Sequence, residues 1–126
     1  MPAALRDILT GYEAGEAMVS VKTGPWATLG NDAAKVRTEV FVQEQRIPRE
    51  MEWDEADQTA IHAVAYNRLG QPLATGRLLV HAPGCGRVGR MAVCRVLRGA
   101  SLGRDVLLAL TQAARGRGDR EIRPGA

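Results

Sequence analysis

The chain has 126 residues, of which 45% are hydrophobic and 25% are charged, and 17 Lys and Arg against 14 Asp and Glu give a net charge of +3. This composition is typical of a globular domain, and no apolar run approaches the ~20 residues of a membrane helix. Residues 1–20 lack the basic start and apolar core of a signal peptide, because Arg6 and Asp7 interrupt the apolar stretch. We therefore expect one cytoplasmic domain over residues 1–126, with an N-terminal extension at 1–15 and a C-terminal stub at 119–126.

The charges are separated along the chain. Residues 39–57 contain seven acidic residues and two arginines, whereas residues 87–123 contain nine arginines and three acidic residues. The second half suits a phosphate-bearing ligand. Nucleic acid is not the expected partner, because no aromatic residues are interleaved with these arginines.

The cysteine pattern indicates neither a disulfide nor a metal site. Cys85 and Cys94 stand alone, without a CxxC pair or a matching group of histidines. We expect two free thiols and no bound metal.

In the first half of the chain, alternating residues at 16–22 predict a strand that ends in the turn at 23–25. Trp26 follows as a candidate core residue. Asn31 is the predicted N-cap of a helix whose apolar positions recur at helical spacing as far as Phe41, before Ile47 and Pro48 close the segment. Residues 48–58 have no clear strand period and are interpreted as a loop or a short helical turn.

The second half predicts three strands and a helix. Strands at 60–68 and 73–80 form an antiparallel hairpin, and a further strand covers 86–94. His62 lies on a strand face, where a packed and hydrogen-bonded histidine is expected rather than a catalytic base. The last helix starts near Leu102 and stops at the glycines that follow Arg115. The fold class is therefore α+β.

The turn between residues 94 and 102 is the candidate binding site. A strand leads through Arg98, Gly99, Ser101 and Gly103 into a helix, so several free N–H groups and the positive helix end would face one point. Such a point binds phosphate. The alternative is a plain connecting turn, in which the glycines allow close packing and the arginines are solvated.

Several stretches together resemble the GNAT superfamily of acyl-CoA-dependent N-acyltransferases, and in particular its small bacterial ElaA-like branch. They cover roughly residues 17–118 in the order expected for that family. The matching stretches are Val36–Pro48, Trp53–Asp57, His62–Ala65, Ala74–Leu78, Val88–Val93 and Arg98–Gly103.

The resemblance implies a mixed, mainly antiparallel sheet flanked by helices, with acetyl-CoA or another acyl-CoA as co-substrate and a primary amine as acceptor. The fourth strand would pair with the pantetheine arm and polarise the thioester carbonyl through an N–H, and the turn after it would hold the pyrophosphate. Ser101 stands where the family's Q/R-x-x-G-x-G/A loop has its middle glycine. The implied coenzyme A residues are Met91, Ala92, Val93, Arg98, Gly99, Ala100, Ser101, Leu102, Gly103 and Arg104.

The acidic stretch corresponds to the wall that borders the acceptor in this superfamily. Glu44, Asp54 and Asp57 are therefore candidates for attracting an ammonium group or taking its proton, and the alternative is a solvated loop. The family's last strands are not recognised after residue 118, which would leave the fourth strand as an open edge and favour a homo-oligomer. The alternative function is a non-catalytic acyl-CoA-binding or assembly module.

Overall fold

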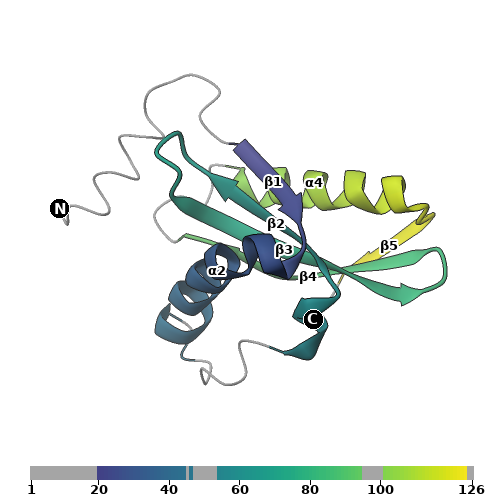
Figure 1. The fold of residues 1–126 in the computed structure, drawn as a ribbon, viewed down its shortest axis with the longest axis horizontal. Helices are drawn as coiled ribbons and strands as arrows, with labels where there is room; N and C mark the ends of the chain where they lie inside the picture. Colours follow the sequence, from purple (N-terminus) through teal and green to yellow (C-terminus); the bar gives the residue numbers. More distant parts are fainter. Residues whose placement is uncertain (1–19, 45, 47–53, 95–100, 125–126) are drawn as a thin grey trace.

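The computed structural model describes residues 20–44, 46, 54–94 and 101–124. These residues form a five-stranded sheet with helices on both sides (Figure 1). The elements in chain order are β1 (Ser20–Gly24), α2 (Trp26–Arg37), the π-helix η1 (Thr38–Glu44), the 3-10 helix η2 (Glu55–Gln58), β2 (Ile61–Tyr66), β3 (Pro72–Ala82), β4 (Cys85–Val93), α4 (Leu102–Arg117) and β5 (Glu121–Pro124).

The strands follow one another across the sheet in sequence order, β1-β2-β3-β4-β5. The first four pair antiparallel and β5 pairs parallel with β4. This arrangement confirms the predicted α+β fold with a mainly antiparallel sheet, including the hairpin of β2 and β3 and the strand that follows it. Within the described ranges, no helix has both the length and the apolar character needed to cross a membrane.

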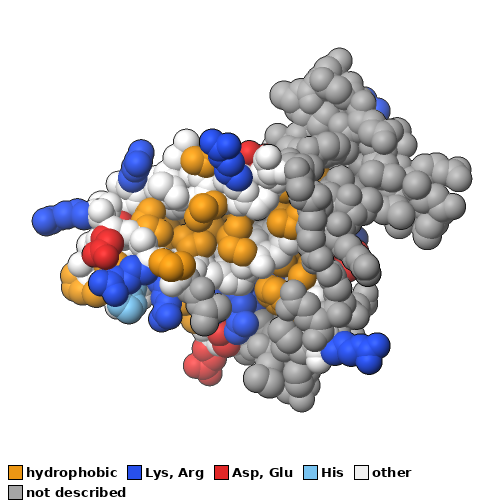
Figure 2. All heavy atoms as spheres, turned by 180° about the vertical axis from the view of Figure 1, so that it is seen from behind, with side chains coloured by type: hydrophobic (Ala, Val, Ile, Leu, Met, Phe, Trp, Pro, Cys, Tyr) orange, Lys and Arg blue, Asp and Glu red, His pale blue; other side chains and the backbone are white. Residues whose placement is uncertain are grey.

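The two long helices cover opposite faces of the sheet, as the alternation along β2 shows. Ala63 and Ala65 belong to the core under α4, whereas Val64 and Tyr66 pack with Leu29 of α2. Because successive strand residues point to opposite faces, a strand buried on both faces reads as a continuous apolar run. Figure 2 shows the molecule from the side opposite to Figure 1, where hydrophobic side chains gather near the middle of the face.

The start of α2 differs from the sequence prediction. The helix begins at Trp26, after Pro25 in extended conformation, and Asn31 lies exposed inside it rather than at its N-cap. A Cβ on Gly30 would lie 2.7 Å from the Trp26 ring, so the glycine makes room for the tryptophan. That ring also packs 5.0 Å from the His62 ring, measured between centroids.

The C-terminal stub contains a short strand. Four of its residues form β5, which pairs with Cys85 to Val88 of β4. Pro124 is tolerated because it ends a short edge strand, where a missing N–H breaks no central ladder. The outer edge of β4 is therefore covered over its first half, and in the described part of the chain no strand pairs with it from Gly89 to Val93. Self-association through this remaining edge stays a prediction.

Candidate active site

The start of α4 presents free backbone donors. Ser101 precedes the helix with φ 66° and ψ 14°, and its carbonyl accepts the N–H of Asp105 at 3.0 Å as the first bond of the helix. The N–H groups of the first turn have no partner inside a helix, and they point along its positive end. Leu102 is fully buried and fixes this end of the helix against the core.

The start of α4 adjoins the end of β4. A Cβ built on Gly103 would lie 3.6 Å from Cγ2 of Val93. The N–H of Cys94 donates to the carbonyl of Leu73 in β3 at 2.8 Å. Because backbone groups alternate in direction along a strand, the N–H and C=O of Val93 point to the outer edge of β4. Outward backbone groups and helix N–H groups therefore face the same region.

A bulge interrupts β4 just before these residues. Thr75 pairs with Ala92, and Arg77 pairs with Gly89. Between these two pairs the chain advances by two residues on β3 but by three residues on β4. The extra residue is Arg90, which has φ 50°. A positive φ costs a residue with a Cβ about 1–2 kcal/mol, so this conformation requires compensation from its surroundings.

The bulge decides which side chains face α4. Strict alternation from Val88 would point Arg90 into the apolar core under that helix. With one extra residue, Met91 and Val93 pack against this core instead. The Met91 sulfur fills the place that a Cβ on Gly76 would occupy. The bulge thus moves an arginine out of the core and leaves a half-buried apolar strip along the outer half of β4.

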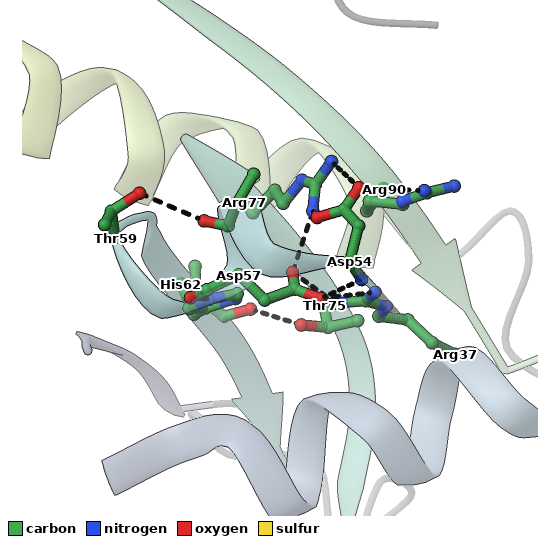
Figure 3. Close-up of polar contacts among 10 residues, drawn as sticks. Arg37, Asp54, Asp57, Thr59, His62, Thr75, Arg77 and Arg90 are labelled. Atoms are coloured by element: carbon green, nitrogen blue, oxygen red, sulfur yellow. Dashed lines mark hydrogen bonds and ion pairs between the residues drawn. The ribbon is translucent and has the colours of Figure 1, made fainter. Parts of the chain in front are cut away.

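On the α2 face, a network of arginines and aspartates connects four elements (Figure 3). Asp57 of η2 is fully buried, and it accepts hydrogen bonds from Arg37 of α2 at 2.9 and 3.0 Å and from Arg77 of β3 at 2.8 Å. Asp54 accepts two bonds from Arg77, at 2.6 and 3.0 Å, and one from Arg90 of β4 at 3.3 Å. Arg77 therefore joins both carboxylates.

The network sets the protonation states of its members. Hydrogen bonds from Arg77, opposed by partial burial, lower the pKa of Asp54 from 3.8 to about 2. Burial raises the pKa of Asp57, but bonds from Arg37 and Arg77 outweigh it, and the pKa stays below its ordinary value. Both groups are carboxylates at neutral pH. Burial lowers the pKa of His62, whose Nε2 donates to the carbonyl of Asp57 at 2.8 Å.

Comparisons with known proteins identify the family. The structure superimposes on an N-acetyltransferase from Lactobacillus plantarum with a TM-score of 0.72 and 30% identity, covering 81% of this chain and 70% of that one. An acyl-CoA N-acyltransferase from Pseudomonas aeruginosa gives a TM-score of 0.68 and 31% identity over 79% of this chain and 72% of that one. The chain belongs to the GNAT superfamily of N-acyltransferases.

Two further comparisons extend this result. The uncharacterised N-acetyltransferase YjcF of Bacillus subtilis is 39% identical over 83 residues, which cover 66% of this chain and 58% of the relative. Escherichia coli ElaA shares the fold, with a TM-score of 0.74 at 20% identity over 86% of this chain and 78% of that one. No family model matches the sequence.

The fold brings together those of the predicted coenzyme A residues that the structure describes. Met91, Ala92 and Val93 end β4, and Ser101 to Arg104 begin α4 beside them. Arg104 is exposed. Arg98, Gly99 and Ala100 lie outside the described residues. Ser101 occupies a left-handed position, a conformation that suits glycine better than serine.

Two of the three acidic candidates, Asp54 and Asp57, accept hydrogen bonds from arginines. The N–H of Asp54 also donates to the Asp57 carboxylate at 3.2 Å. The side chain of Glu44 is outside the described part of the structure. His62 is packed and hydrogen-bonded, as predicted, and the described thiols of Cys85 and Cys94 are buried and not disulfide-bonded.

The sequence analysis missed the three arginines of the network. A signal was present for two of them, because Arg37 continues the buried stripe of α2 four residues after Ala33, and Arg77 interrupts the apolar run of β3. A charged residue at a core position requires a buried partner. For Arg90 no such signal existed, since its direction depends on the bulge.

Proposed function

We propose that this protein is an acyl-CoA-dependent N-acyltransferase, which transfers an acetyl or related acyl group to a primary amine. The observation that carries the proposal is the meeting of the outward edge of β4 with the start of α4. Peptide groups at the β4 edge are suited to pair with the amide groups of pantetheine. The helix N-terminus is suited to the pyrophosphate, because its N–H groups and dipole favour an anion.

Two half-buried apolar residues on this part of β4, Met91 and Val93, support the proposal. They pack against the core under α4 and would shield a thioester at this edge from water.

The proposed reaction is a direct attack. The neutral amine nitrogen adds to the thioester carbonyl carbon, and an outward N–H at the end of β4, in the range Met91–Val93, stabilises the developing oxyanion. The tetrahedral intermediate collapses with formation of the amide C–N bond and cleavage of the C–S bond. The amine loses one proton and the coenzyme A thiolate gains one. Because Asp54 and Asp57 are tied to arginines, we expect the general base elsewhere.

Binding is tested by thermal unfolding with and without acetyl-CoA. A ligand at a hundred times its Kd adds about 2.7 kcal/mol to the free energy of unfolding. The informative variant is Gly103→Ala, whose added Cβ meets Val93 at an ordinary contact distance of 3.6 Å and so fits the free protein. We expect this variant to unfold near the wild-type temperature and to lose most of the shift, because the methyl group blocks close approach of a phosphate.

Gly116→Ala is the matched control. Gly116 lies near the other end of α4, and no described atom lies within 4 Å of a Cβ at this position. It should keep the full shift. No stabilisation of the wild-type protein at millimolar acetyl-CoA, or an equal shift in both variants, would contradict the proposed site.

Activity is tested separately by measuring release of free coenzyme A thiol with a panel of primary amines. A transferase releases thiol above the uncatalysed rate with at least one amine. Binding without release would favour the alternative, a non-catalytic acyl-CoA-binding module.

A further inference from the structure

Asp54 lies beside the bulge between β3 and β4. Its two carboxylate oxygens accept both Nη groups of Arg77, and one of them also accepts from Arg90. Arg77 pairs directly with Gly89, the residue before the extra one. A single carboxylate therefore links two neighbouring strands on either side of the irregular step.

The bulge is held from both faces of the sheet. On the α4 face, Met91 fills the space over Gly76, with Val106 and Leu110 3.1 Å from a Cβ built there. On the α2 face, Arg90 contacts Asp54. The positive φ of Arg90 is unfavourable for a residue with a Cβ, and these contacts offset that cost.

Its protonation behaviour makes Asp54 a poor general base. A base works best when its pKa lies near the operating pH, whereas the Arg77 bonds hold the pKa of this carboxyl at about 2. The side chain is 40% exposed, yet both of its oxygens are already occupied by guanidinium groups. The arrangement is that of a tether rather than of a proton acceptor.

We propose that Asp54 is a positioning residue for acyl transfer, which acts through Arg90 to fix the bulge and so the direction of the backbone groups that follow it on β4. This inference rests on the proposed function for its catalytic consequence. A displacement of about 1 Å at a reacting group can cost on the order of a hundredfold in rate. Loosening the bulge should therefore lower kcat more than it raises the KM for acetyl-CoA, because the start of α4, which would hold the pyrophosphate, is unchanged.

The test compares Asp54→Asn, Arg90→Gln and the double variant. Controls are Glu121→Gln, which removes an exposed carboxylate on β5, and Arg87→Gln, which removes an exposed arginine on β4. Steady-state kinetics give kcat, KM and the pH profile. Hydrogen exchange gives the protection of the Ala92 and Cys94 amides at the end of β4, which face β3, without requiring any activity.

We expect each single variant to lower kcat roughly ten- to a hundredfold, with the KM for acetyl-CoA within about threefold of wild type. The double variant should lose no more than the worse single variant, because both residues act through one contact. The pH profile should keep its shape, and the β4 amides should exchange about tenfold faster than in the controls.

Three results would overturn the inference. They are additive losses in the double variant, disappearance of the low-pH limb of kcat in Asp54→Asn, and unchanged exchange of the β4 amides. A wild-type protein that binds no acetyl-CoA and releases no thiol would refute the proposed function instead. The exchange experiment would still decide whether Asp54 fixes the bulge.

Discussion

Replacing Ser101 with glycine should stabilise the protein. Ser101 has φ 66°, a left-handed conformation that costs a residue with a Cβ about 1–2 kcal/mol. Glycine removes this cost but gains about 0.5–1 kcal/mol of conformational freedom in the unfolded chain. The net gain for Ser101→Gly is about 0.5–1 kcal/mol, which for a domain of this size raises Tm by about 2–5 °C.

Ser101→Ala separates the backbone contribution from that of the hydroxyl group. The Ser101 side chain makes no capping hydrogen bond to α4, so its removal loses no contact with the helix, and alanine keeps the Cβ. We expect its free energy of unfolding to stay within about 0.5 kcal/mol of wild type. Urea and thermal unfolding, followed by circular dichroism, measure all three proteins. A glycine variant less stable than the alanine variant would refute the reasoning from backbone conformation.

Three further predictions concern the network, α2 and pH. Asp57→Ala should lower the free energy of unfolding in urea by about 3–5 kcal/mol, because Arg37 and Arg77 lose a buried carboxylate that accepts hydrogen bonds from both; a loss below about 1 kcal/mol would contradict this. Gly30→Ala should lower Tm, although the exchange usually stabilises a helix by about 1 kcal/mol, because the new Cβ would lie 2.7 Å from the Trp26 ring; a higher Tm would argue against this packing. The contribution of Asp54 should be complete above its ordinary pKa of 3.8 and be lost as the pH falls towards about 2, since folding lowers this pKa. The pKa shift corresponds to at most about 2.4 kcal/mol of stability, and solvent screening of a side chain that is 40% exposed reduces this contribution to about 1 kcal/mol. Unfolding of the wild type and of Asp54→Asn between about pH 2 and pH 4 measures the contribution. Parallel stability curves for the two proteins would disprove the assignment to Asp54.

Much of the sheet and the last helix was predictable because their signals are local. The strands from Ile61 to Val93 show apolar runs and turn residues, and α4 shows a regular apolar stripe that ends in glycine. The start of α2 was predicted too late, at Asn31, whereas the helix begins at Trp26, whose ring packs over Gly30. That contact cannot be read from helix propensity.

The residues of the candidate site could be proposed from the sequence, but their geometry could not. Gly103 and its neighbours carry a local pattern, and the resemblance to known acyltransferases added the adjoining strand. The bulge at Arg90 and the tether to Asp54 arise from residues 36 positions apart in the chain. A strand period assigns faces on the assumption of strict alternation, so one extra residue reverses the assignment from that point onward.

The short β5 has a consequence for the accessibility of a thiol. It has four residues at the edge of the sheet, so it should open more easily than the central strands, in a local fluctuation rather than by global unfolding. Cys85 pairs with Glu121 of β5 and is 7% exposed, whereas Cys94 lies beyond this pairing and is 1% exposed. In a thiol-labelling time course, Cys85 should therefore react at the rate at which β5 opens. Cys94, buried away from β5, should react more slowly.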